Sequence, residues 1–132
     1  MFGKRALKNK KGQTLVETAF VLPIIILILM GILDFGMMFN NYLIVSNASR
    51  EGARNAAVGA TDTEIKSVVG KVSGTLDALK LTTDITPKES LRKKGDEVMV
   101  TVKYNYKFLT PVIGAFFSGK VQLTGTSVMR VE

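Results

Sequence analysis

The chain of 132 residues contains no cysteine, no histidine and no tryptophan, and only three prolines. Without cysteine, the sequence excludes disulfide bonds, thiolate nucleophiles and cysteine-based metal sites. Without histidine, it lacks the side chain that proteins use most often for acid–base catalysis and metal ligation. Serine and threonine are plentiful, but no histidine can activate them, and no glycine-rich phosphate loop follows a strand. We therefore predict that the protein is not an enzyme and has no catalytic residues, metal site, cofactor or small-molecule substrate.

Acidic residues are absent from the first twelve positions, and this absence explains most of the net charge of +7. The rest of the chain has 13 basic and 11 acidic residues. The high isoelectric point therefore comes mainly from a basic leader, predicted as residues 1–12, and no surface for nucleic acid is expected. The five cations of this leader are Lys4, Arg5, Lys8, Lys10 and Lys11.

Charged residues are also absent from residues 18–33, an almost purely apolar run. These 16 residues form about 24 Å of helix at ~1.5 Å per residue. A membrane span needs about 20 residues, a length that the chain reaches by continuing past Asp34 to Phe39. The residues that follow make a poor signal-peptidase site, so we expect the apolar helix to be retained. The basic leader places the N-terminus in the cytoplasm and the bulk of the chain outside, as a single-pass protein of the cytoplasmic membrane.

Two carboxylates flank this run, and each has alternative interpretations. Glu17 could form a capping box with Thr14, because the two residues have the spacing of a helix N-cap and its third helical position. That interpretation needs no partner, but it explains neither Gly12 nor the basic leader. Asp34 is either hydrated at the outer interface or, if it lies deeper, in contact with another subunit or partner. Pro23 would loosen the helix between them, which could help it to bend.

Gly12, followed by Gln13 and then by Glu17 at the edge of the apolar run, resembles the processing site of type IV prepilins. The stretches at residues 12–17, 22–23, 31–36 and 47–54, taken in register, resemble the TadE-like pseudopilins of tight-adherence (Flp) pilus systems. This resemblance covers about residues 11–59. It implies that a prepilin peptidase cuts between Gly12 and Gln13. Glu17 would then pair with the new amine of a neighbouring subunit.

The resemblance also implies the partners and the role of the protein. The partners would be the prepilin peptidase, other pilins and pseudopilins, the pilus assembly platform and membrane lipid. Major pilins of these systems usually carry tyrosine after the glutamate, whereas this chain has Thr18 and a large C-terminal region. We therefore expect a minor pilin that takes part in pilus assembly or initiation. Two alternatives remain, namely an uncleaved single-pass scaffold of a pilus or secretion machine and a major fibre subunit.

Beyond the membrane the helix is expected to continue, giving one long pilin-type helix over residues 13–59. Asn40 and Asn41 mark the best place for a kink, and Gly59 is a plausible terminator. Small residues recur at four-residue spacing at Ala48, Gly52 and Ala56, and such rows let another backbone come close. This ridge could pack on the chain's own C-terminal domain or against other pilin helices.

Residues 60–132 are predicted to form an extracytoplasmic α+β head. A capping box at Thr61 and Glu64 opens a second, amphipathic helix whose apolar positions continue as far as Leu79. A short strand at residues 81–86 and two alternating stretches at residues 98–108 and 120–131 indicate an antiparallel sheet of two or three strands.

Two apolar features of the head have alternative interpretations. The connection at residues 109–117 is unexpectedly apolar, so it is either an exposed contact patch or a flap over the core. Tyr104 and Tyr106 are interpreted as core residues rather than as an aromatic binding strip.

Overall fold

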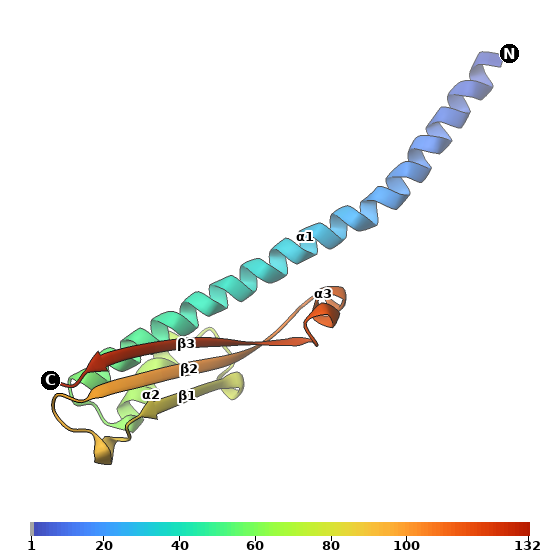
Figure 1. Ribbon diagram of the computed structural model, residues 1–132. Coiled ribbons are helices and arrows are strands. Elements are labelled where there is room, and N and C mark those ends of the chain that lie inside the picture. The colour runs from blue at the N-terminus through green and yellow to red at the C-terminus, as the bar shows by residue number, and fades with distance from the viewer. Residues whose placement is uncertain (1) are drawn as a thin grey trace.

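The computed structural model describes residues 2–132, with side chains described from Lys10 onward. Three cations of the predicted leader, Lys4, Arg5 and Lys8, therefore lie outside the described side chains. The fold is α+β, as predicted: a long N-terminal helix carries a small head at its C-terminal end (Figure 1). Helix α1 (Phe2–Ala57) has 56 residues, which makes it about 84 Å long at ~1.5 Å per residue.

Helix α1 passes without interruption through the positions where the sequence suggested a start or a kink. The Thr14 hydroxyl donates to the carbonyl of Lys10 at 2.9 Å, one turn earlier in the helix. Thr14 therefore lies inside the helix and is not an N-cap, so the interpretation of Glu17 as part of a capping box is wrong. Asn40 and Asn41 also lie within the continuous helix, and Figure 1 shows gradual curvature rather than a sharp bend.

The C-terminus of α1 is closed by a glycine in a left-handed conformation. Gly59 has φ = +90°, a conformation that glycine adopts without the steric penalty of a Cβ atom. Its amide donates to the carbonyl of Ala56 at 3.2 Å, and the amide of Ala60 donates to Asn55 at 3.1 Å. This pattern is a Schellman motif, and it supports the prediction that Gly59 terminates the helix.

Helix α2 (Asp62–Val72) begins with the capping box that the sequence predicted. The Glu64 amide donates to the Thr61 hydroxyl at 3.2 Å, and the Thr61 amide donates to the Glu64 carboxylate at 2.9 Å. The prediction that the apolar face continues to Leu79 is wrong. The helix stops at Val72, and Leu79 is 95% exposed in the short 3₁₀ helix η1 (Ala78–Lys80).

Three antiparallel strands form one sheet in the order β1-β2-β3. They are β1 (Leu81–Thr86), β2 (Glu97–Lys107) and β3 (Lys120–Arg130). The central strand is 11 residues long and alternates buried with more exposed residues, as a half-buried strand should. The short helices η2 (Glu89–Leu91) and α3 (Pro111–Phe116) lie in the connections on either side of β2.

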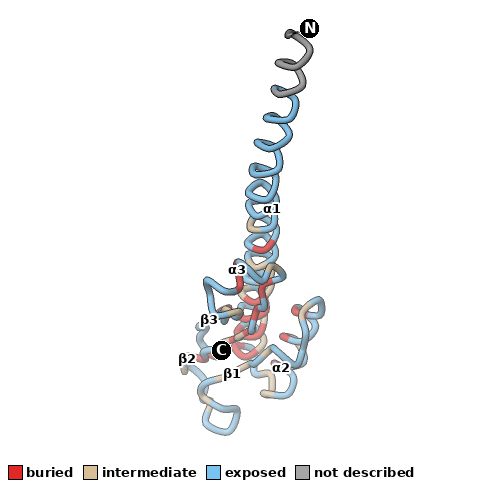
Figure 2. The backbone as a smooth tube through the Cα atoms, turned by 90° about the vertical axis from the view of Figure 1, so that its right-hand side faces the viewer, coloured by how far each residue is buried: buried red, intermediate tan, exposed pale blue. Residues whose placement is uncertain are grey.

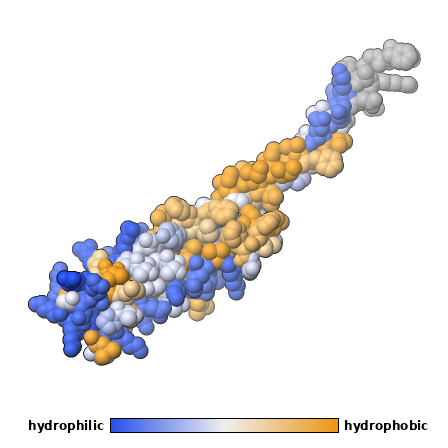
Figure 3. All heavy atoms as spheres, viewed as in Figure 1, coloured by the Kyte–Doolittle hydropathy of each residue, from blue (hydrophilic) through white to orange (hydrophobic). Residues whose placement is uncertain are grey.

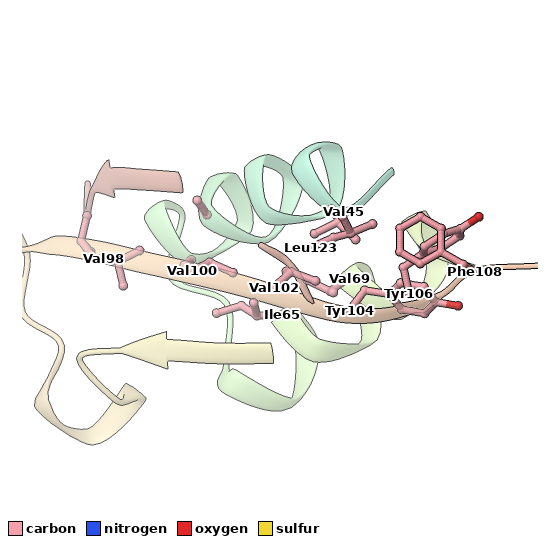
Figure 4. Packing of buried hydrophobic residues seen from close by; sticks show 14 of the residues in the cluster. Val45, Ile65, Val69, Val98, Val100, Val102, Tyr104, Tyr106, Phe108 and Leu123 are labelled. Atoms are coloured by element: carbon pink, nitrogen blue, oxygen red, sulfur yellow. The ribbon is translucent and has the colours of Figure 1, made fainter. Parts of the chain in front are cut away.

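The core lies between this sheet and the helices α1 and α2. Figure 4 shows Val100 and Val102 of β2 beside Ile65 and Val69 of α2, with Val98 farther along the same strand, and all five side chains are completely buried. Valine and isoleucine suit this place because β-branched side chains pack well on a pleated surface. The apolar stem of α1 lies outside this core, as the exposed tube in Figure 2 shows.

Candidate functional site: the exposed apolar helix and its junction with the head

The first half of α1 exposes its apolar side chains on all sides. Every large hydrophobic residue from Leu15 to Leu33 is 42–74% exposed. Among the described residues, α1 is the one helix long and apolar enough to cross a membrane, and none of its most apolar stretch is buried within the chain. Figure 3 shows this apolar surface between the first polar residues with described side chains and the head. Because such a surface is unstable in water, lipid or other protein chains must cover it.

The residues predicted for processing and assembly lie at the N-terminal edge of this surface. Gly12, Gln13 and Glu17 are all exposed on α1. A Cβ atom added to Gly12 would meet nothing within 4 Å, so this glycine is not required by packing inside the chain. The structure does not bring Glu17 near Asp34, since Glu17 lies on the free stem and Asp34 lies where the head begins.

Asp34 is only 1% exposed, although it follows the most apolar stretch of the chain. One carboxylate oxygen accepts a hydrogen bond from the amide of Leu109 at 2.9 Å, and the other accepts from the amide of Thr110 at 3.0 Å. The backbone carbonyl of Asp34 accepts from the hydroxyl of Tyr106 at 3.2 Å. Sequence reasoning weighed a hydrated carboxylate against a contact with another subunit. The structure shows a third situation, in which Asp34 fixes the head's own β2–α3 connection to α1.

Tyr106 remains a hydrogen-bond donor in this arrangement. Burial raises the pKa of its hydroxyl, and the nearby Asp34 carboxylate and Tyr104 raise that pKa further. The protonated form is therefore favoured over the phenolate. Tyr104 and Tyr106 are 8% and 4% exposed, which agrees with their interpretation as core residues.

An aromatic cluster strengthens the same junction. Phe35 of α1 makes edge-to-face contacts with Phe108 and Phe117, whose ring centroids lie 6.2 and 6.1 Å from its own. Phe108 and Phe117 stack on each other at 5.2 Å. Such pairs contribute roughly 0.5–1.5 kcal/mol beyond the burial of their area. Sequence reasoning missed this cluster, and the spacing of the three phenylalanines along the chain gives no indication of it.

The apolar connection between β2 and β3 is partly a flap over the core and partly exposed. Ile113 and Gly114 are buried and close the core, and the Ile113 Cδ1 atom lies 3.3 Å from where a Cβ on Gly31 would be. The other large apolar residues of this connection are exposed. They are Leu109, Val112, Phe116 and Phe117, which we call the apolar tip, and they are 44–82% exposed.

The small residues at the far end of α1 are buried against the chain's own head. Ala48 and Ala56 have no exposed surface. A Cβ on Gly52 would lie 3.0 Å from Val69 Cγ2 and 3.1 Å from Val100 Cγ1. The structure therefore supports the first interpretation of this ridge, in which it packs on the chain's own head. Among the described residues, no three acidic side chains gather where they could hold a metal ion.

Sequence reasoning also missed Gly125, which lets β3 cross α1 at close range. A Cβ at this position would lie 2.8 Å from the carbonyl oxygen of Val45 and 3.0 Å from the Cα atom of Ser46. A glycine inside a strand pattern is the general indication of such a close approach. Beside it, the hydroxyls of Ser49 and Ser127 form a hydrogen bond of 3.2 Å between α1 and β3.

Comparison with protein families gives a match to the model described as TadE-like protein, over residues 12–54. Comparisons with curated proteins and with solved structures gave no match. The matched segment begins at Gly12, contains the whole exposed apolar run and Asp34, and ends just before α1 does. The match confirms the resemblance predicted from the sequence: residues 12–54 are similar to the TadE-like family.

Proposed function

We propose that this protein is a minor pilin of a tight-adherence type IV pilus. It is held in the cytoplasmic membrane by α1, with the N-terminus in the cytoplasm and the head outside, and then takes part in pilus assembly or initiation. One observation carries the proposal: α1 exposes a long apolar surface that its own head does not cover, within a segment that matches the TadE-like family. A subunit that moves from lipid into a protein fibre needs such a surface in both places.

Processing by a prepilin peptidase between Gly12 and Gln13 is part of the proposal. Gly12 is exposed, and its place in the chain would tolerate a side chain. A peptidase must draw the peptide out of the helix, and glycine lowers the cost because it disfavours the helix by roughly 1 kcal/mol relative to alanine. The requirement for glycine would then come from the peptidase rather than from the fold.

Glu17 supplies the second part of the mechanism. Cleavage would create a positive amine at Gln13, one turn before the carboxylate of Glu17 on the same exposed stem. A single charge in hydrocarbon costs at least about 2–3 kcal/mol. If Glu17 of one subunit meets the amine of its neighbour, both charges are neutralised as the stems pack together.

The cleavage step is tested by determining the N-terminus of the membrane-purified protein. We expect a chain that starts at Gln13, and we expect the Gly12→Val variant to keep its leader. Gly36→Val is the matched control, because Gly36 is also exposed on α1 with nothing within 4 Å of a new Cβ. An intact leader in the wild-type protein would instead support the alternative of an uncleaved membrane scaffold.

The assembly step is tested by the amount of protein in sheared surface filaments. The Glu17→Gln variant should be cleaved normally but recovered in filaments at a reduced level. The Glu17→Asp variant retains the charge and should recover part of that loss. Equal recovery of all three proteins would refute the charge pairing. If the chain made up most of the filament mass, it would be the major fibre subunit.

A further inference from the structure

We propose that the apolar tip of the head enters the outer interface of the membrane that α1 crosses, so that the head contacts lipid directly beside the helix. This inference rests on the membrane-spanning part of the proposed function and is independent of cleavage. The tip is thus proposed to contact the boundary between the lipid headgroups and the acyl chains.

The exposure of the tip is the first observation. Phe116 is 82% exposed, Leu109 is 66%, Val112 is 50% and Phe117 is 44%. Single exposed apolar residues are common on proteins, but four that lie together on the one connection between β2 and β3 are not. At the same time the tip is held firmly, because Ile113 is buried beneath it and Phe117 stacks on Phe108.

The second observation is the place of the tip along α1. Ile113 meets α1 at Gly31, and Phe117 meets it at Phe35. A span of about 20 residues that starts after Glu17 ends near Met37. The tip therefore lies at the depth where α1 leaves the hydrocarbon. Figure 3 shows the apolar surface of α1 continuing onto this part of the head, without a polar band between the two.

The buried carboxylate of Asp34 is the third observation. It lies on α1 between Gly31, which Ile113 contacts, and Phe35, which Phe117 contacts, at a depth where an unshielded charge is unfavourable. The amides of Leu109 and Thr110, which bind both of its oxygens, belong to the connection that forms the tip. The tip therefore presents apolar side chains outward and backbone donors inward, as expected of a segment that shields a carboxylate from lipid.

The charges at the base of the tip agree with a lipid surface. Lys107 and Lys120 are direct partners in the register of β2 and β3, and both are exposed. They are the last residue of β2 and the first of β3, so they flank the tip. Lysines in this position can reach anionic headgroups while the apolar residues between them enter the interface. This charge, together with the continuity with α1, favours lipid over a second copy of the chain.

The absence of cysteine makes a site-specific test direct. The full chain is reconstituted into vesicles of phosphatidylethanolamine and phosphatidylglycerol, after one residue has been changed to cysteine and labelled with a fluorophore. The test sites are Phe116→Cys and Val112→Cys. Leu91→Cys is the control in the head, because Leu91 is equally apolar and 68% exposed but lies in η2, away from the tip. Ile25→Cys is the control within the apolar run.

Two quenchers decide the result: lipid brominated near the headgroup end of its acyl chains, and iodide in the water. We expect brominated lipid to quench the labels at Phe116 and Val112 roughly twofold or more relative to Leu91, with protection from iodide, as for a segment at interfacial depth. Quenching by iodide would overturn the inference, since the tip would then lie in water. Protection from both quenchers would also overturn it, in favour of a tip covered by a second copy.

If the label at Ile25 also failed to meet brominated lipid, the membrane-spanning part of the proposed function would fail as well. Quenching at Ile25 without quenching at the tip would refute this inference alone.

Discussion

Two parts of helix α1, the free stem and the end bound to the head, differ in how their apolar side chains are buried. The stem, residues 10–33, carries large side chains such as Phe20 and Ile24, which are 74% and 58% exposed. The head-bound end, residues 45–57, buries small ones such as Ala48 and Ala53 completely. The largest apolar side chains of α1 therefore lie where the rest of the chain buries the least of their surface. Large side chains serve a helix that lipid will cover, whereas small ones let a sheet approach the backbone.

This contrast predicts that the same kind of substitution will have different effects at the two ends. A charge in the stem should affect the interaction with the membrane and leave the folding of the head unchanged. Extra volume at the head-bound end should affect folding and leave the membrane interaction unchanged. The junction around Asp34 connects the two, because its carboxylate belongs to α1 and its donors belong to the head.

The largest effect is expected for a charge at the centre of the stem. Ile26→Arg places a guanidinium near the middle of the apolar run, where arginine costs about 2.5–3.5 kcal/mol. That cost corresponds to a fall of about 100-fold in the partition between membrane and water. The measurement is the fraction of protein that floats with vesicles after alkaline extraction.

The matched control for this change is Leu91→Arg. Leu91 is also apolar and is 68% exposed, but it lies in η2 of the head. This variant should stay in the membrane fraction like the wild-type protein. Equal retention of both variants would mean that the stem is not buried in lipid.

At the head-bound end the strongest effect is expected from one added methyl group. Gly125→Ala would bring a Cβ to 2.8 Å from the carbonyl oxygen of Val45. The obstructing atoms belong to the backbone of α1, so they cannot turn aside as a side chain could. We expect a loss of about 2–3 kcal/mol in the free energy of unfolding of the head, towards the upper end of the usual cost of overpacking.

This loss can be followed in the full chain in detergent by the near-ultraviolet circular dichroism of the tyrosines, two of which lie in the core. Thr124→Ala is the control, because it changes the exposed neighbour on the same strand. Membrane retention of Gly125→Ala should be normal. A stability equal to that of Thr124→Ala would show that β3 does not need to lie so close to α1.

Most of the fold follows from local patterns, and these could be identified in the sequence. The strand at Leu81–Thr86, the alternation along β2 and the capping box at Thr61 are properties of adjacent residues. The end of α2 could not be predicted in the same way. Apolar spacing continues to Leu79, but the helix stops at Val72 and leaves Leu79 exposed. Gly70 and Gly74 weaken the helix there, and that local cost outweighed the pattern.

The candidate site was only partly predictable, for a different reason. Gly12 and Glu17 were predicted from their spacing and from the apolar run beside them, and their roles stay predictions. The partners of Asp34 could not be identified from the sequence. Leu109 and Thr110 lie 75 and 76 positions away, and they contribute backbone amides rather than distinctive side chains. Any residue but proline offers such an amide. The row of small residues at Ala48, Gly52 and Ala56 could also be recognised in the sequence. Which surface packs against it could not, because that depends on tertiary packing.

A smaller effect is expected at the junction. Asp34→Ala removes the acceptor of two amides and should cost about 1–2 kcal/mol, as for buried donors that lose a charged partner. Asp34→Asn keeps one acceptor oxygen and should cost less. Hydrogen exchange of the Leu109 and Thr110 amides is the specific measurement, because both should exchange faster in the alanine variant while the amides of β2 stay protected. If those two amides kept their protection, the carboxylate would not be what fixes the connection to α1.

The smallest effect is expected when glycine is changed to alanine once in the head and once in the membrane part of α1. The comparison shows whether these two regions unfold separately. Gly70 is exposed within α2, and a Cβ there would meet nothing within 4 Å. Gly70→Ala should therefore stabilise the head by about 0.5–1 kcal/mol, because alanine loses less backbone entropy on folding. Gly36 in α1 is equally unobstructed, but a helix in lipid stays helical when the head unfolds, since every backbone group there must remain hydrogen-bonded. Gly36→Ala should therefore leave the thermal midpoint of the head unchanged. An equal gain from both variants would show that this part of α1 folds and unfolds together with the head.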